Sequence, residues 1–158
     1  MKKLILRLGE LACVFLLAGF IVFVVSQDKI STVPVKTVAK SVTSVCDLKE
    51  LKKRDKLELK RKFSVDAASY RGFVYYSSET VMDVRELLVI SADNTQDIKL
   101  LEEKISKYVS EKAELFEGYA PQESELISSH VLISKKGYLL FYIGNDKEKV
   151  VSAFSESL

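Results

Sequence analysis

The feature that most constrains this chain is an uninterrupted apolar run near its N-terminus. The sequence LACVFLLAGFIVFVV, residues 11–25, carries no charge, and the segment before it is basic, with Lys2, Lys3 and Arg7. A basic start followed by an apolar stretch is typical of a secretory signal or a signal anchor. The uncharged run has 15 residues, and counting from Leu8, with Glu10 near the interface, lengthens the segment to 18, close to the roughly 20 that span a bilayer.

We expect residues 8–26 to form a retained signal-anchor helix, because bulky apolar residues continue to its end. Cleavage after Ser26 is the alternative, since Val24 and Ser26 suit the small-residue rule for signal peptidase, and a buried core helix is a third interpretation. The basic residues predict that residues 1–7 are cytoplasmic and that the C-terminal part lies outside the cell membrane. Cys13 does not indicate a lipoprotein, because the apolar run follows this cysteine instead of preceding it.

The composition predicts a folded, electrically neutral outer domain. The 158 residues include 24 basic and 22 acidic side chains. Residues 1–26 contain 3 of the basic and 1 of the acidic side chains, so residues 27–158 carry 21 of each kind. A neutral domain lacks the basic surface that a nucleic acid requires. Two cysteines and one histidine exclude a disulfide-rich scaffold and a Cys/His zinc cluster. Cys46, the one cysteine of the outer part, is expected to be a free thiol, and an intermolecular disulfide is the alternative.

Two charged or polar stretches precede the first predicted strand. Residues 27–45 are interpreted as a linker, although a short helix could begin around residues 38–45. Residues 47–62, DLKELKKRDKLELKRK, predict a solvated helix with i,i+4 ion pairs that packs a few leucines on the domain. The alternative is a basic helix that contacts anionic lipid or wall polymer.

Two β-hairpins are predicted further along the chain. Aromatic and β-branched residues at Tyr70–Tyr76 and Val84–Ile90 indicate the first antiparallel pair. Glu125–Ser134 and Tyr138–Ile143 indicate the second, joined by Lys135-Lys136-Gly137. The last strand is apolar on both faces, which favours a central place in its sheet.

Two helices accompany these hairpins. The clearest covers Thr95 to Glu117, with Asn94 as N-cap and Gly118 as C-terminal stop. A final helix follows Asn145, which with Glu148 resembles a capping box. Its apolar stripe contains Val150, Val151, Phe154 and Leu158. The order helix, ββ, helix, ββ, helix predicts an α+β fold, in which one antiparallel sheet built from two hairpins packs against helices behind an N-terminal transmembrane helix.

The residue constellations predict no catalytic, cofactor-binding or metal-binding residue. His130 is the only histidine, and a lone histidine beside a strand is typical of packing or surface exposure. An envelope hydrolase would need Glu86, Glu123 or a serine beside His130 in a cleft. Glu86, with Arg85, is expected near an edge or end of its strand. A groove for a glycan or small ligand is a further hypothesis, lined by the aromatic strand residues Tyr70, Phe73, Tyr75, Tyr76, Tyr138, Phe141 and Tyr142.

Residues 46–158 resemble the bacterial domain-of-unknown-function family 4358. The resemblance rests on SETVMDVRELLVI (78–90), FEGYAPQE (116–123), HVLISKKGYLLFYI (130–143) and DKEKVVSAF (146–154). It implies a small envelope protein of Gram-positive Firmicutes, carrying a lipoprotein signal or a membrane anchor. It brings no established activity and no site residues.

The sequence therefore predicts a single-pass membrane protein whose residues 46–158 form an extracytoplasmic α+β domain. We expect a non-enzymatic interaction or accessory module of the cell envelope, which binds an envelope protein or a wall component. The alternatives are a small-ligand or glycan-binding envelope domain, and secretion after cleavage near Ser26.

Overall fold

One antiparallel sheet organises the domain, and its five strands lie in the order β1-β2-β3-β5-β4. The structure, a computed structural model, describes residues 15–19 and 30–158. The strands are β1 (Leu51–Arg54), β2 (Gly72–Ser78), β3 (Glu86–Ser91), β4 (Val131–Lys135) and β5 (Tyr138–Ile143). β3 and β5 pair with each other, and every residue of both is buried. The predicted α+β class, the antiparallel sheet and the interior position of the last strand are thus confirmed.

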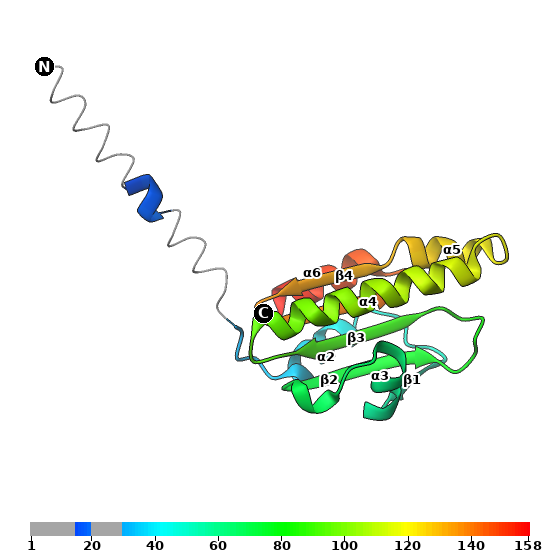
Figure 1. Cartoon of the computed structure of the whole chain (residues 1–158), viewed down its shortest axis with the longest axis horizontal. Helices are drawn as coiled ribbons and strands as arrows, with labels where there is room; N and C mark the ends of the chain where they lie inside the picture. The colour runs from blue at the N-terminus through cyan, green and yellow to red at the C-terminus, as the bar shows by residue number, and fades with distance from the viewer. Residues whose placement is uncertain (1–14, 20–29) are drawn as a thin grey trace, which may run out of the picture.

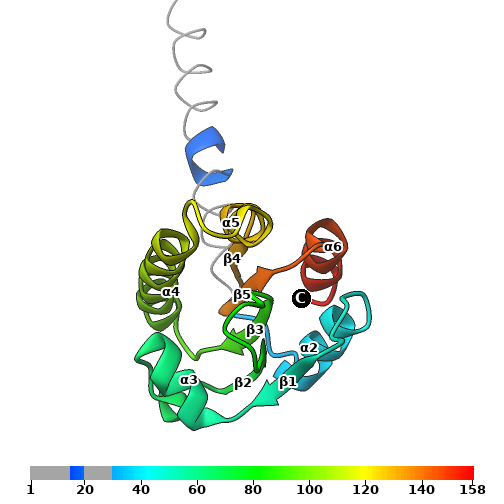
Figure 2. The same ribbon diagram turned by 90° about the vertical axis from the view of Figure 1, so that its right-hand side faces the viewer.

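Helices cover both faces of this sheet, so the domain has three layers (Figure 2). On one face lie α3 (Lys56–Phe63), α4 (Thr95–Phe116) and α5 (Pro121–Ser128). On the other lie α2 (Val35–Thr43) and α6 (Lys147–Glu156). A short 3-10 turn, η1 (Ala67–Ser69), links α3 to β2. Because both faces are covered, the central strands β3 and β5 are mostly apolar, and the polar exceptions in β3 are its two end residues, Glu86 and Ser91.

Local signals account for the longest helix and the tightest turn. The Asn94 side chain accepts a hydrogen bond from the backbone N–H of Asp97, and Gly118 has a φ of 72° just after the helix. Both predicted ends of the helix over residues 95–117 are therefore confirmed. The β4–β5 turn places Lys136 and Gly137 at φ of 50° and 77°, as a two-residue hairpin with right-handed strand twist requires.

The prediction of one helix over residues 47–62 is wrong. Leu51–Arg54 instead form edge strand β1, which pairs with β2 from Leu51 opposite Ser78 to Arg54 opposite Tyr75. Asp55 then caps α3 by accepting the backbone N–H groups of Leu57 and Glu58. The exposed sheet edge and this cap outweigh the helix propensity of the lysines.

Two further predicted boundaries are wrong. The strand expected at Glu125–Ser134 begins only at Val131, because Pro121 starts helix α5 and the buried Ile127 anchors it. The capping box expected at Asn145 is absent: α6 starts at Lys147, and its N-cap residue Asp146 makes no side-chain capping bond.

The segment expected as a linker, residues 27–45, contains helix α2. Val38 and Val42 of this helix are fully buried against the sheet. Most of the predicted anchor, residues 8–26, lies outside the described residues, as does Cys13; residues 15–19 are helical and exposed. Within residues 15–19 and 30–158, none of the helices combines the length and the apolar character needed to cross a membrane.

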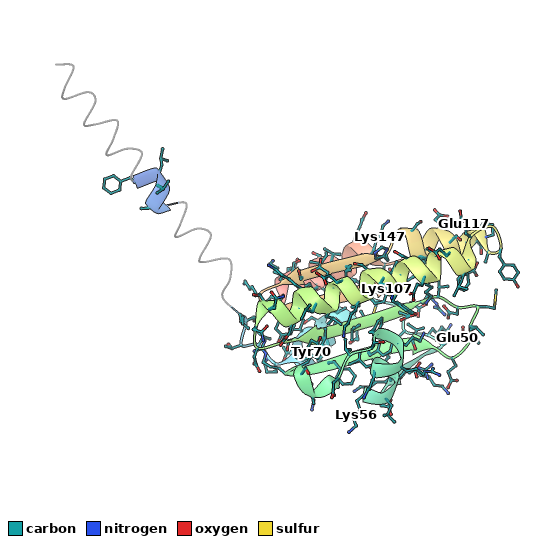
Figure 3. All side chains as sticks on the ribbon, viewed as in Figure 1. Glu50, Lys56, Tyr70, Lys107, Glu117 and Lys147 are labelled. Carbon is teal, nitrogen blue, oxygen red and sulfur yellow. The ribbon has the colours of Figure 1, made fainter. Side chains whose placement is uncertain are left out.

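Different segments of the chain lie at the two ends of the sheet (Figure 1). Residue 30 and the C-terminus lie together at one end, which we call the proximal end: the Ser31 N–H donates to the Lys136 carbonyl, and Lys136 Nζ donates to the Leu158 carbonyl. The loop between β2 and β3 and the turn after α4 lie at the opposite end, which we call the distal end. Figure 3 labels Glu50 and Glu117 there.

Candidate functional site

A buried carboxylate marks the distal end of the sheet. Glu86 is the first residue of β3, an interior strand, and is 1% exposed. It shares strand parity with Leu88 and Ile90, so it points into the layer formed by α3 and α4. Its predicted place at a strand end is confirmed, but it lies in the middle of the sheet.

Four side chains surround the Glu86 carboxylate. Tyr75 Oη donates to Oε2 at 2.8 Å, while Lys112 Nζ, at 2.5 Å, and Tyr108 Oη both donate to Oε1. Lys62 Nζ lies 3.5 Å from the same Oε1. Both oxygens are therefore occupied, and the buried charge is compensated by two lysines, as burial of a carboxylate requires. We call Lys62, Tyr75, Glu86, Tyr108 and Lys112 the Glu86 cluster.

Burial and charge change the acidity of this cluster. Burial, followed by the negative charge of Glu86, raises the pKa of Tyr75 and of Tyr108 well above the ordinary value. Both phenols thus remain protonated donors at neutral pH. Burial also lowers the pKa of Lys112, against the opposing pull of Glu86.

A cavity of about 240 Å³ opens beside the cluster, between the β2–β3 loop and the C-terminal half of α4. Its polar lining includes the charged side chains of Lys62, Asp83, Glu86, Glu111 and Lys112 and the phenol of Tyr108. Its apolar part comes from Val81, Leu115 and Phe116. Val81 is 90% exposed and Leu115 77% exposed, so the entrance is apolar and faces solvent.

Hydrogen-bond capacity decides what this cavity can do. The three N–H groups of Lys112 have three acceptors: Glu86, the Val84 carbonyl at 3.2 Å and Tyr108 Oη at 3.3 Å. Lys62 has two, Tyr108 Oη at 3.3 Å and Glu86 at 3.5 Å. Within the described residues, Lys62 therefore keeps one N–H for an acceptor that enters the cavity. The arrangement is suited to binding an apolar group that carries a hydrogen-bond acceptor.

His130 lies outside this cluster. Its Nδ1 is 2.8 Å from the Ile127 carbonyl oxygen, and its ring packs 6.4 Å from that of Phe141. Glu86 is held by its tyrosines and Lys112, and Glu123 lies in the first turn of α5. The structure thus does not bring Glu86 to His130. Among residues 15–19 and 30–158, no three His, Cys, Asp or Glu side chains gather as a metal site.

The aromatic strand residues do not share one surface. Tyr75, Phe141, Tyr70 and Phe73 pack in the α3–α4 layer, whereas Tyr138, Tyr142 and Tyr76 pack in the α2–α6 layer. Tyr75, Tyr138 and Phe141 are completely buried. A single groove lined by the whole set is therefore excluded by the alternation of the strands.

Cys46 is a half-buried free thiol that follows α2. Burial raises its pKa to about 11, with smaller contributions from Asp146 and Asp47. Little thiolate forms at neutral pH, so the thiol is a weak nucleophile.

Sequence reasoning missed Lys62, Tyr108 and Lys112 as members of a site. Tyr108 and Lys112 are four residues apart on α4 and so share one helix face. The one local signal for a site was therefore a tyrosine and a lysine on the same face of this helix. Nothing local indicated that Glu86 and Lys62 meet them.

One family model matches residues 44–144, with the description Domain of unknown function (DUF4358). The chain belongs to this family. No curated protein and no solved structure matches the chain significantly. The DUF4358 match contains all five residues of the Glu86 cluster, and it excludes helices α2 and α6. The resemblance predicted from the sequence is confirmed.

Proposed function

We propose that this protein is a membrane-tethered, non-enzymatic module outside the cytoplasm, whose distal end binds a protein of the cell envelope. The observation that carries the proposal is the apolar entrance to the Glu86 cavity. Four large apolar side chains are exposed at this end: Val81 at 90%, Met82 at 47%, Leu115 at 77% and Tyr119 at 73%. Exposed apolar groups gathered at one place favour a binding surface.

The position of this surface supports a tethered module. Residue 30 enters the domain at the proximal end, and the apolar entrance is at the distal end (Figure 1). With the chain tethered to the bilayer through the segment before residue 30, as we propose, the distal end stays accessible to a partner outside the membrane. The basic segment ahead of residues 11–25 favours that orientation.

The chemistry of the cavity supports binding more than turnover. Both Glu86 oxygens and all three Lys112 N–H groups have partners within the domain. Within the Glu86 cluster, Lys62 is the group with a spare hydrogen-bond donor. We infer that the partner inserts an apolar side chain whose neighbouring carbonyl or carboxylate accepts from Lys62.

Site-specific photo-crosslinking in native membranes tests this proposal. The full-length chain carries benzoylphenylalanine at position 81 or 115, and at position 57 as the matched control, because Leu57 is also apolar and 68% exposed but does not line the cavity. We expect a discrete protein adduct from positions 81 and 115 only. A deletion of residues 1–26 should move the protein out of the membrane fraction and abolish the adduct.

Two results would contradict the proposal. Equal adducts from positions 57, 81 and 115 would mean that the distal end is not selective. If the Lys62→Met variant still gives full yields of the adducts at positions 81 and 115, the Glu86 cavity does not take part in recognition.

A further inference from the structure

A second cavity, of about 380 Å³, lies at the proximal end of the domain. Its walls come from the segment before α2, from the first turn of α2, and from the ends of β2 and β3. The residues that matter for its chemistry are Pro34, Lys36, Arg71, Phe73, Ser91 and Tyr138. The cavity shares no residue with the Glu86 cavity.

A buried hydroxyl without a partner lines this cavity. Ser91 is completely buried, and within the described residues its Oγ makes no hydrogen bond. A buried polar atom is ordinarily satisfied, and leaving one without a hydrogen bond is unfavourable. Because Ser91 lies in the wall of the cavity, a ligand seated deep in the cavity would supply the missing acceptor for this hydroxyl.

The start of α2 supplies further donors to the same cavity. Pro34, the N-cap residue, makes no side-chain capping bond, and the first turn contains no acidic residue. The N–H groups of Thr37 and Val38 donate to the Pro34 carbonyl, whereas those of Val35 and Lys36 have no acceptor among the described residues. Free N–H groups and the helix dipole make an uncapped helix start favourable for an anion.

Of the residues that the structure describes, two cations and no acidic residue line the cavity. Arg71 Nη2 donates to the Ser31 carbonyl at 2.9 Å, and the guanidinium lies 5.5 Å from the centre of the Tyr138 ring, which holds it in place. Asp93, 83% exposed, is 3.6 Å from Arg71 Nε and leaves part of the guanidinium available. Lys36 makes no ion pair among the described residues.

We propose that this proximal cavity binds the phosphate group of a phosphate ester. The residues that line the cavity carry a guanidinium, a hydroxyl, an ammonium and free backbone N–H groups, and several donors suit the oxygens of a phosphate better than a planar carboxylate. Pro34 and Phe73 offer apolar surface to the organic part of the ester. The phosphate could belong to a lipid headgroup or to a soluble molecule, and both sources have the same chemistry at the site.

The test is a titration of the ¹⁵N-labelled full-length protein in a zwitterionic detergent, followed by amide chemical shifts. The probes are inorganic phosphate for the soluble source and dihexanoyl phosphatidic acid for the lipid source. We expect saturable shifts of the Val35, Lys36 and Ser91 amides. Saturation by both probes assigns the site to phosphate in general, and saturation by phosphatidic acid alone assigns it to lipid headgroups.

Variants separate the site from surface charge. Arg71→Gln and Lys36→Gln should each weaken binding, by about tenfold for Arg71→Gln, whereas Arg61→Gln is the matched control because Arg61 is exposed and lies outside the cavity. Ser91→Ala should also weaken binding without lowering the melting temperature, because its hydroxyl has no partner to lose. Lys36 is exposed on α2, so its variant tests binding even if Arg71→Gln does not fold.

Each probe is added up to its solubility limit, and at least to a tenfold excess over the protein. The proposal is overturned if neither probe then gives saturable shifts of these amides. It is equally overturned if Arg71→Gln and Lys36→Gln bind phosphatidic acid as tightly as Arg61→Gln does.

Discussion

At the scale of single residues, the pair formed by Glu86 and Lys112 stabilises the domain only while both members are present. The two side chains are 2% and 11% exposed, and the nitrogen lies 2.5 Å from the carboxylate oxygen. Removal of one member leaves the other charge buried without its closest partner. We therefore expect Lys112→Met to lower the free energy of unfolding by about 3–5 kcal/mol at pH 7, measured by urea denaturation.

A double variant and a variant of an exposed lysine test whether the loss of stability comes from the Glu86–Lys112 pair. The double variant Glu86→Gln/Lys112→Met should lose clearly less stability than the sum of the two single variants, because it leaves no uncompensated charge. Lys107→Met is the matched control, since Lys107 is 79% exposed on the same helix and should change stability by less than about 0.5 kcal/mol. Additive losses in the double variant would contradict the coupling.

At the scale of elements, α2 acts as part of the core although it belongs to a segment with the composition of a linker. Val42 is fully buried and packs in the layer that also contains Leu87, Val89 and Leu140. Val42→Ala should lower the free energy of unfolding by roughly 1–3 kcal/mol through lost apolar burial and the cavity left behind. Thr37→Ala, on the exposed side of the same helix, should leave the urea midpoint unchanged. Equal midpoints for both variants would contradict a core role for α2.

The elements also differ in how well the sequence predicted them. The helix over residues 95–117 was predicted to within one residue, because its apolar stripe, N-cap and glycine stop are local. Strand β1 and helix α5 were missed, because each is short and depends on a distant neighbour: β1 on the free edge of β2, and α5 on the pocket that buries Ile127. Short segments carry too few residues for periodicity to distinguish a strand from a helix.

At the scale of the whole molecule, the residues matched by the family model and the residues of the folded unit have different boundaries. The DUF4358 match ends at residue 144 and starts at residue 44, so it leaves out both helices of the α2–α6 layer. Without them, one face of the sheet would expose Leu87, Val89 and Leu140. We therefore expect residues 44–144 alone to aggregate or to unfold without a cooperative transition, and residues 30–158 to unfold cooperatively.

Circular dichroism during heating distinguishes the two fragments. A sigmoidal transition for residues 30–158 and a flat or irreversible one for residues 44–144 is the expected outcome. Cooperative unfolding of both at the same temperature would show that α2 and α6 are dispensable for the core.

The sequence by itself determined those features that depend on neighbouring residues: the apolar run of residues 11–25, the long amphipathic helix, the Lys136-Gly137 turn and the resemblance to a family of unknown function. Tertiary structure alone decided the two cavities. The Glu86 cluster joins Lys62 and Tyr75 to residues of β3 and α4, and the proximal cavity joins Lys36 to Arg71 and Ser91. Such sites form only when separate elements pack against one another. The hydrogen-bonding capacity of a side chain leaves no repeating pattern along the sequence, whereas a helix leaves a periodic one.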